Sequence, residues 1–167
     1  MARPLCAQLP GVGEPLQKAV SDLAGQHARW HVEKISPGVV PGMTEYEFVS
    51  ANDSFVLWKT TLSVVADTVC SSLASYAVFP THKSMAEDAQ AAFARIVGWA
   101  IPAHGAPASV TDSTWHADSL GELRATFRDG FYVTGGGGFP FVFEGFGDIN
   151  TCLRASRWHP APKTPRR

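Results

Sequence analysis

The chain has 167 residues, of which 45% are hydrophobic and only 17% charged, and its 14 Lys and Arg nearly balance its 15 Asp and Glu. This length suits one domain whose core is stable without disulfides or metals. The net charge of −1 gives no overall field that would attract a nucleic acid. We therefore expect a single globular domain over residues 1–159 and a disordered, basic, Pro-rich tail over residues 160–167.

The cysteines Cys6, Cys70 and Cys152 are odd in number and widely spaced, and they form no C-x-x-C pair. This arrangement argues against a disulfide framework and against a zinc ribbon. Residues 1–13 also lack an apolar run long enough for a signal peptide. We therefore expect reduced thiols and a cytoplasmic location.

The first elements follow from Pro15, which suits the first turn of a helix. Apolar side chains then recur at helical spacing from Leu16 to about Lys34, which predicts the first helix. Two prolines and two glycines in residues 36–42 end this helix. The short alternating run around Phe48 predicts an isolated strand.

Residues 55–79 carry few charges, and their apolar side chains keep a helical rhythm. At 100° per residue, one side collects the apolar set Phe55, Trp58, Leu62, Val65, Val69, Leu73 and Tyr76. The opposite side is polar and rich in hydroxyls, with Thr60, Ser63, Asp67, Ser71 and Ser75. This pattern predicts a long central amphipathic helix, and its polar side argues against a transmembrane segment. The Val and Thr content also suits a pair of strands, which is the alternative for this span.

A capping box at residues 84–87 opens the next helix, which we expect to run from Met85 to about Ala100. Its small-residue face predicts close antiparallel packing against the central helix as a helical hairpin. Residues 102–107 are interpreted as a linker, because they contain two prolines. A second capping box at residues 119–122 predicts a short helix that ends at Gly130.

Four glycines at residues 135–138 lie between two aromatic runs, which predicts a β-hairpin in which Phe139, Phe141 and Phe143 share one face. Asp148 caps a last helix that contains Cys152 and extends to Trp158. The expected fold is therefore α+β and helix-rich. It has a long central helix in an antiparallel helical hairpin, packed with the aromatic β-hairpin and a short C-terminal helix.

One chemical hypothesis concerns Cys152. The helix dipole stabilises the thiolate form of a cysteine in the first turn of a helix. A nucleophilic cysteine also needs a nearby histidine as its base. His116 is the candidate base, with His82 as the other choice. On this hypothesis the protein is a small enzyme with a Cys/His nucleophilic site.

A second hypothesis concerns the Trp-His dipeptide, which occurs three times and places His31, His116 and His159 after a tryptophan. Three converging imidazoles bind a divalent metal, and Asp118 would be a further ligand or an outer partner. Since no H-x-x-x-H spacing places two of them on one helix face, the alternative is three aromatic pairs at the margin of a core.

The low charge and the many aromatic residues favour an interaction surface over a catalytic site. We therefore expect a non-enzymatic interaction module that needs no cofactor and whose partner is another protein or a second copy of itself. The residues expected to bind are aromatic: Phe139, Phe141, Phe143, Trp115 and Trp158. A further alternative is a small apolar ligand enclosed against the hydroxyl-rich side of the central helix.

Overall fold

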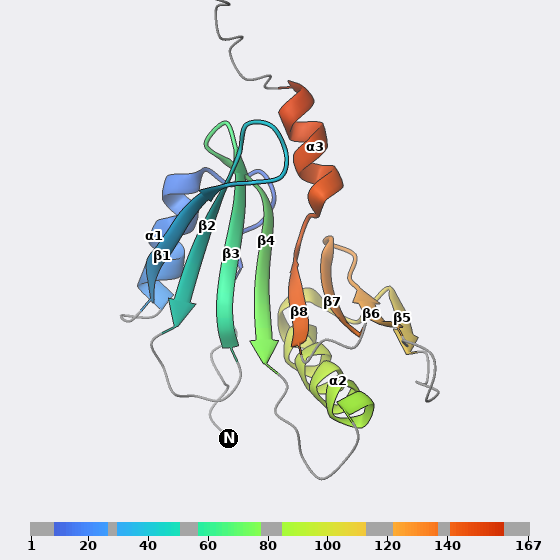
Figure 1. Ribbon diagram of the computed structural model, residues 1–167. Coiled ribbons are helices and arrows are strands. Elements are labelled where there is room, and N and C mark those ends of the chain that lie inside the picture. The colour runs from blue at the N-terminus through green and yellow to red at the C-terminus, as the bar shows by residue number, and fades with distance from the viewer. Residues whose placement is uncertain are drawn as a thin grey trace, which may run out of the picture.

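The computed structural model describes residues 9–26, 30–50, 57–77, 85–112, 122–136 and 141–158. These ranges contain three helices and eight strands (Figure 1). In chain order they are α1 (Leu16–Gln26), β1 (Trp30–Pro37), β2 (Met43–Ser50), β3 (Leu57–Val65), β4 (Thr68–Ala77), α2 (Met85–His104), β5 (Ser109–Asp112), β6 (Glu122–Thr126), β7 (Phe131–Gly136), β8 (Phe141–Phe146) and α3 (Ile149–Trp158).

All eight strands form one sheet in the order β1-β2-β3-β4-β8-β7-β6-β5, and every neighbouring pair is antiparallel. The sheet consists of two four-stranded meanders, and each meander follows a helix in the chain. The last strands of the two meanders, β4 and β8, pair with each other at the centre of the sheet (Figure 1). The two halves therefore repeat one helix-plus-four-strands arrangement that the sequence did not reveal as a repeat.

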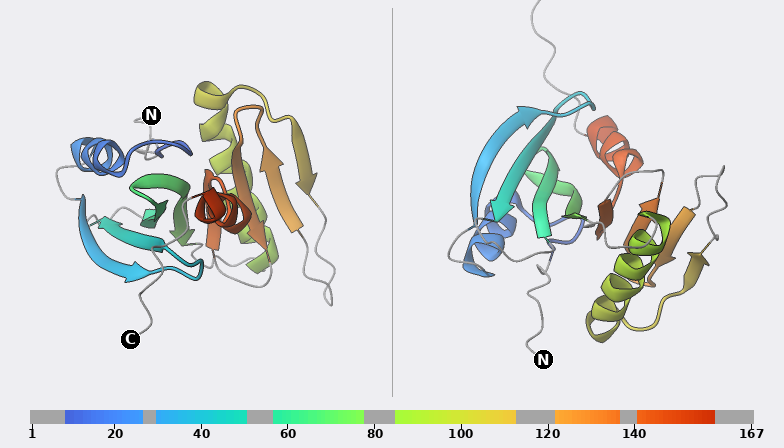
Figure 2. Two further views of the ribbon diagram at one scale, coloured as in Figure 1. Left: turned by 90° about the horizontal axis from the view of Figure 1, so that it is seen from above. Right: turned by 60° about the horizontal axis from the view of Figure 1, so that its bottom comes forward.

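Helices α1 and α2 contribute to one continuous apolar core against the sheet. α1 contacts β1 and β4 in the first half, whereas α2 contacts β6, β7 and β8 in the second (Figure 2). Leu23 of α1 and Ile96 of α2 are almost fully buried in this core. We call this side of the sheet the helix face.

Helix α3 packs on the opposite side, against β3 and β4. Val64 of β3 belongs to the main core, whereas the next residue, Val65, belongs to a separate small cluster with Met43 and Cys152. Because successive side chains of a strand point to opposite faces, α3 lies on the face that α1 and α2 do not cover. We call it the α3-side face.

The prediction of a long central helix over residues 55–79 is wrong. The described part of this span is the β3–β4 hairpin, and its turn residues Ala66 and Asp67 have φ of 50° and 57°. Such left-handed pairs suit the tight turns that connect antiparallel strands. The helical reading failed because two hydroxyl residues, Thr60 and Ser72, are buried, which hid the strand alternation. The predictions of a helix-rich fold class and of a helical hairpin depended on this helix, so they are also wrong.

Other elements were predicted with mixed success. The first helix begins at Leu16 as expected but ends at Gln26 instead of continuing to Lys34. The helix expected after residue 119 is instead strand β6. α2 begins at Met85 as predicted and continues to His104, but it packs on the sheet and not on another helix.

The hairpin is confirmed as β7 and β8, and the last helix as α3. The aromatic rings of the hairpin lie on both faces of the sheet, because Phe131 belongs to the core and Phe143 points to the α3-side face. Asp148 caps α3 as predicted, since its Oδ1 accepts a hydrogen bond from the Thr151 amide at 2.8 Å. Within the described ranges, no helix is both long and apolar enough to cross a membrane. Residues 160–167 lie outside those ranges, so the predicted tail stays a prediction.

Candidate functional site

The α3-side face runs across the seam between the two halves of the sheet. Its side chains alternate along each strand with core residues such as Leu62, Ala74 and Val133. Across the seam, Leu73 of β4 lies opposite Gly145 of β8. From β3 to β7 the face contains Thr61, Ser63, Ser71, Leu73, Ser75, Phe143, Gly145, Tyr132 and Thr134.

Hydroxyl groups dominate the middle of this face, and most of its side chains are half-buried. Ser63 lies directly opposite Ser71, and Thr61 lies opposite Leu73. The solvent face of an antiparallel sheet usually carries charged residues, which a hydroxyl row replaces here. A neutral face of this kind loses less hydration free energy on contact with a partner than a face of Lys and Glu would.

Charged side chains lie toward the two sides of the face. On the first half, Lys59 Nζ lies 3.5 Å from Glu47 Oε1, and both side chains are about three quarters buried or more. On the second half, the guanidinium of Arg124 lies over the ring of Tyr132, 5.4 Å from its centroid. Burial raises the pKa of Tyr132, and Arg124 opposes that shift, so the phenol stays neutral at physiological pH.

Helix α3 covers one end of the face and projects beyond the strands (Figure 1). Cys152 forms a disulfide with Cys70 of β4, and both residues are at most 2% exposed. The expectation of reduced thiols therefore does not match the structure, because widely spaced cysteines meet where α3 packs on β4. A disulfide-bonded cysteine cannot form a thiolate, so in this state Cys152 cannot act as the predicted nucleophile.

The predicted binding residues are only partly described. Phe143 is half-buried on the α3-side face, and Trp158 at the end of α3 is 84% exposed. Phe141 belongs to β8, but its side chain is outside the description. Phe139 and Trp115 lie outside the described residues.

The predicted metal and base residues are mostly not described. His31 belongs to β1, an edge strand, and its side chain is not described. His116, His159, His82 and Asp118 lie outside the described ranges. Among the residues that the structure describes, no group of three His, Cys, Asp or Glu could hold a metal ion. The three-histidine site stays a prediction.

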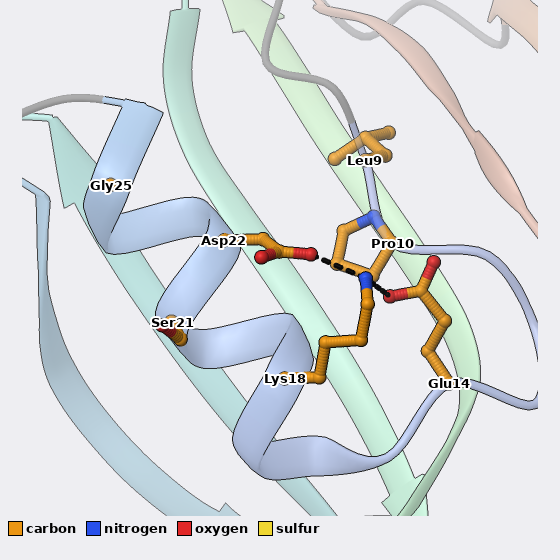
Figure 3. A pocket seen from close by; sticks show the side chains of 7 residues that line it. All are labelled: Leu9, Pro10, Glu14, Lys18, Ser21, Asp22 and Gly25. Carbon is orange, nitrogen blue, oxygen red and sulfur yellow. Dashed lines mark hydrogen bonds and ion pairs between the residues drawn. The ribbon is translucent and has the colours of Figure 1, made fainter.

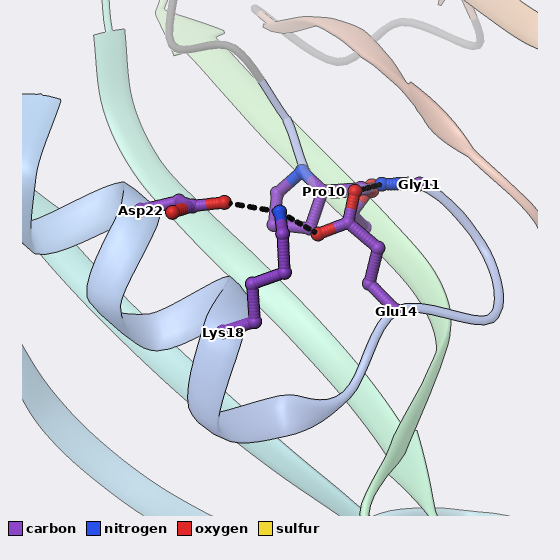
Figure 4. Close-up of polar contacts among 6 residues, drawn as sticks. Pro10, Gly11, Glu14, Lys18 and Asp22 are labelled. Carbon is purple, nitrogen blue, oxygen red and sulfur yellow. Dashed lines mark hydrogen bonds and ion pairs between the residues drawn. The ribbon is translucent and has the colours of Figure 1, made fainter.

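One pocket, of about 460 Å³, lies between the N-terminal segment and α1 (Figure 3). Lys18 Nζ lies 2.6 Å from Asp22 Oδ2 and 3.2 Å from Glu14 Oε2, and Glu14 also accepts a hydrogen bond from the Gly11 amide (Figure 4). Hydrogen bonds to Asp22 and Glu14 raise the pKa of Lys18. The ammonium is thus already bound by two carboxylates, and the group holds the N-terminal segment against α1.

A second pocket, of about 400 Å³, lies between the N-terminal segment, the β6–β7 turn and the start of α3. Asp129 lines it, and its Oδ2 lies 2.6 Å from Nδ1 of His104. The imidazole stacks on the ring of Phe131 with 3.9 Å between centroids. A carboxylate that orients an imidazole is typical of general bases, but His104 is not among the residues that line the pocket. The pair therefore holds the end of α2 on the β6–β7 turn.

A buried acid lies in the helix-face core at the seam. Glu144 of β8 is 3% exposed, and the phenol of Tyr76 on β4 donates a hydrogen bond to its carboxylate oxygen Oε1. Burial raises the pKa of Glu144 to about 7, although the bond from Tyr76 opposes the shift. Thr60 of β3 follows in the same row, on the far side of Ala74. Its buried hydroxyl has no hydrogen-bond partner in the described part of the chain.

His104 and Glu144 were not predicted as site residues. His104 was placed in a linker, although a histidine in the last turn is a recognised signal of a helix C-terminus. Glu144 is a single carboxylate within an aromatic run, and that position between Phe143 and Gly145 was the available signal. Comparisons with protein-family models, curated proteins and solved structures give no match to this chain.

Proposed function

We propose that this protein is a non-enzymatic interaction module that associates with a second copy of itself through the α3-side face. The observation that carries the proposal is the hydroxyl-rich middle of that face, formed by Thr61, Ser63 and Ser71 around Leu73. Of the three described helices, only α3 packs on this side of the sheet.

A hydroxyl group both donates and accepts hydrogen bonds. A two-fold interface is formed by the same surface patch on both copies. The patch must therefore be complementary to itself. A face of lysines or of glutamates fails that requirement because like charges repel. Rows of Ser and Thr around an apolar centre are self-complementary, because every hydroxyl can donate to or accept from a hydroxyl of the other copy. Two antiparallel sheets can bring such rows together, since sheets pack face to face at about 10 Å.

The charged groups near this face are compatible with such contact. Lys59 is paired with Glu47 within one copy, so neither charge is left without a partner when water is excluded. The guanidinium of Arg124 lies over Tyr132, and both groups are enriched at protein interfaces. Trp158 at the end of α3 is 84% exposed, which leaves its indole free to contact a partner.

Sedimentation equilibrium tests the proposal. The unmodified protein should form a dimer at about 100 μM, a range in which interfaces of modest size assemble. Leu73→Arg places a charge at the centre of the face and should weaken association at least about tenfold, or roughly 1.4 kcal/mol. Thr61→Lys should act in the same direction, because two copies would then bring like charges together.

The matched control is Ala94→Arg, which adds the same charge to an exposed position of α2, a helix on the opposite side of the sheet. It should leave the association unchanged. Circular dichroism checks that each variant keeps the native strand content. An unmodified protein that stays monomeric at about 100 μM contradicts the proposal, as does a dimer that Leu73→Arg and Thr61→Lys leave intact.

A further inference from the structure

Helix α3 has little non-covalent anchorage. Of its ten residues only Cys152 is buried. Its larger apolar side chains remain partly exposed, with Ile149 45% exposed, Leu153 37% exposed and Trp158 84% exposed. None of the three belongs to a core cluster, so α3 contributes little to the enclosed core.

Two further contacts of α3, among the residues that the structure describes, involve small side chains. Ala155 packs against a cluster formed by Val40, Met43, Val65, Cys70 and Cys152. The hydroxyl of Ser156 donates a hydrogen bond to the carbonyl of Pro41 at 2.6 Å. An isolated helix of this length is unstable in water, since fewer than about 12 residues do not repay nucleation. α3 therefore needs its attachment to the rest of the protein to stay ordered, and the bond between Cys152 and Cys70 is a covalent part of that attachment.

The connection between β8 and α3 contains a residue suited to a hinge. Gly147 has a φ of 66°, which glycine adopts without strain. A Cβ at this position would lie 2.3 Å from the carbonyl oxygen of Cys70, so only glycine lets the chain pass this close to β4. α3 is thus joined to β8 through a glycine and to β4 through a disulfide at Cys152.

We propose that the Cys70–Cys152 disulfide is a redox-controlled latch that decides whether α3 stays docked on the sheet. A dithiol reductant opens it: one thiolate attacks a protein sulfur, the Cys70–Cys152 bond breaks and a mixed disulfide forms. The second thiol of the reductant then closes its own disulfide. Two electrons and two protons pass from the dithiol to the protein, leaving two protein thiols.

Release of α3 uncovers the apolar cluster around Met43 and Val65. Because both sulfurs are almost fully buried, attack requires a transient local opening that exposes one sulfur while the bond is still intact, so reduction is slow. The inference rests on the docking of α3 alone and does not need the self-association proposed above.

Hydrogen exchange with mass spectrometry tests the latch on the full chain. Amides of residues 153–157 should exchange at least about tenfold faster in the dithiol-reduced protein than in the oxidised protein. The variant Cys70→Ala, Cys152→Ala should show the same change without any reductant, and trypsin should cut it faster after Arg154 and Arg157. Amides of Leu62 and Val64 in the core should be unaffected. Cys6→Ser leaves the disulfide intact and is the control.

Three results would overturn the inference. The first is unchanged protection of residues 153–157 after reduction, which means that non-covalent contacts suffice. The second is a loss of protection throughout the sheet, which means that the bond holds the whole fold and not α3. The third is two free thiols at Cys70 and Cys152 in protein prepared under oxidising conditions.

Discussion

Tyr76 and Glu144 form a buried hydrogen bond across the seam that joins the two halves of the sheet. The phenol on β4 is the donor, and the carboxyl on β8 is the acceptor. Both side chains are 3% exposed. An acid at this position makes the stability of the sheet depend on pH, because its charged form is costly to bury.

We predict that the free energy of unfolding falls as the pH rises through the range from about 4.5 to 7. Burial raises the pKa of Glu144 from 4.5 to about 7, so the unfolded chain releases its proton first and ionisation favours unfolding. Ionisation of Glu144 lowers the free energy of unfolding by about 3 kcal/mol in total, and this reduction stays constant above the pKa of the folded state. Urea unfolding of the unmodified protein and of Glu144→Gln between pH 4 and 8 measures it. The variant should lack this component and should be the more stable protein at pH 8, whereas parallel pH profiles for the two proteins would contradict the prediction.

The buried hydroxyl of Thr60 gives a second prediction. Because its Oγ1 has no hydrogen-bond partner among the described residues, Thr60→Val should stabilise the fold by about 1 kcal/mol. Ser72 offers the matched control, since its hydroxyl donates to the Pro10 carbonyl at 2.7 Å in the same core. Ser72→Ala should destabilise by about 1 kcal/mol. Equal destabilisation of both variants in thermal unfolding would show that the Thr60 hydroxyl is satisfied in solution.

The His104–Asp129 pair gives a third prediction. Burial acts to raise the pKa of Asp129, but hydrogen bonds from His104 and from the Phe131 amide outweigh it and leave the pKa below its ordinary value. A lowered acid pKa contributes stability at neutral pH that is lost as the pH falls through that pKa, below about 4. Since the side chain is 44% exposed, Asp129→Asn should cost only about 0.5–1 kcal/mol at pH 7.

The comparison for this pair is Asp67→Asn, at an exposed turn where asparagine also tolerates a positive φ. It should change stability by less than Asp129→Asn does at pH 7. At pH 3 the effect of Asp129→Asn should shrink, because the carboxyl is then becoming protonated. A cost that is the same at pH 3 and pH 7 would mean that the charge of Asp129 contributes nothing.

The sequence identified local structure best where short-range signals decide it. The start of α2 at Met85, the aromatic hairpin and the Asp148 cap of α3 depend on neighbours in the chain, and all three were predicted correctly. The β3–β4 hairpin was not, because tertiary burial of Thr60 and Ser72 broke the apolar alternation. Propensity is a weak guide when long-range strand pairing decides the structure.

The candidate site was harder to predict because distant parts of the chain build it. Cys70 and Cys152 are 82 residues apart, so their pairing depends on where α3 packs. The α3-side face joins β3 and β4 to β7 and β8 only through the pairing of β4 with β8. The predicted polar side of a helix, with Thr60, Ser63, Asp67, Ser71 and Ser75, does not exist as one group. Three of these residues, the serines, lie on the α3-side face, whereas Thr60 is buried on the helix face and Asp67 lies in the β3–β4 turn.

The most direct test of the proposed self-association is a concentration series of amide NMR spectra of the full chain. The account predicts that shifts and line widths change with concentration for Thr61, Ser63, Ser71 and Leu73, which lie together on the α3-side face. Exposed positions of α2, such as Ala94, should stay unchanged. Spectra that do not depend on concentration, or changes confined to α1 and α2, would contradict it.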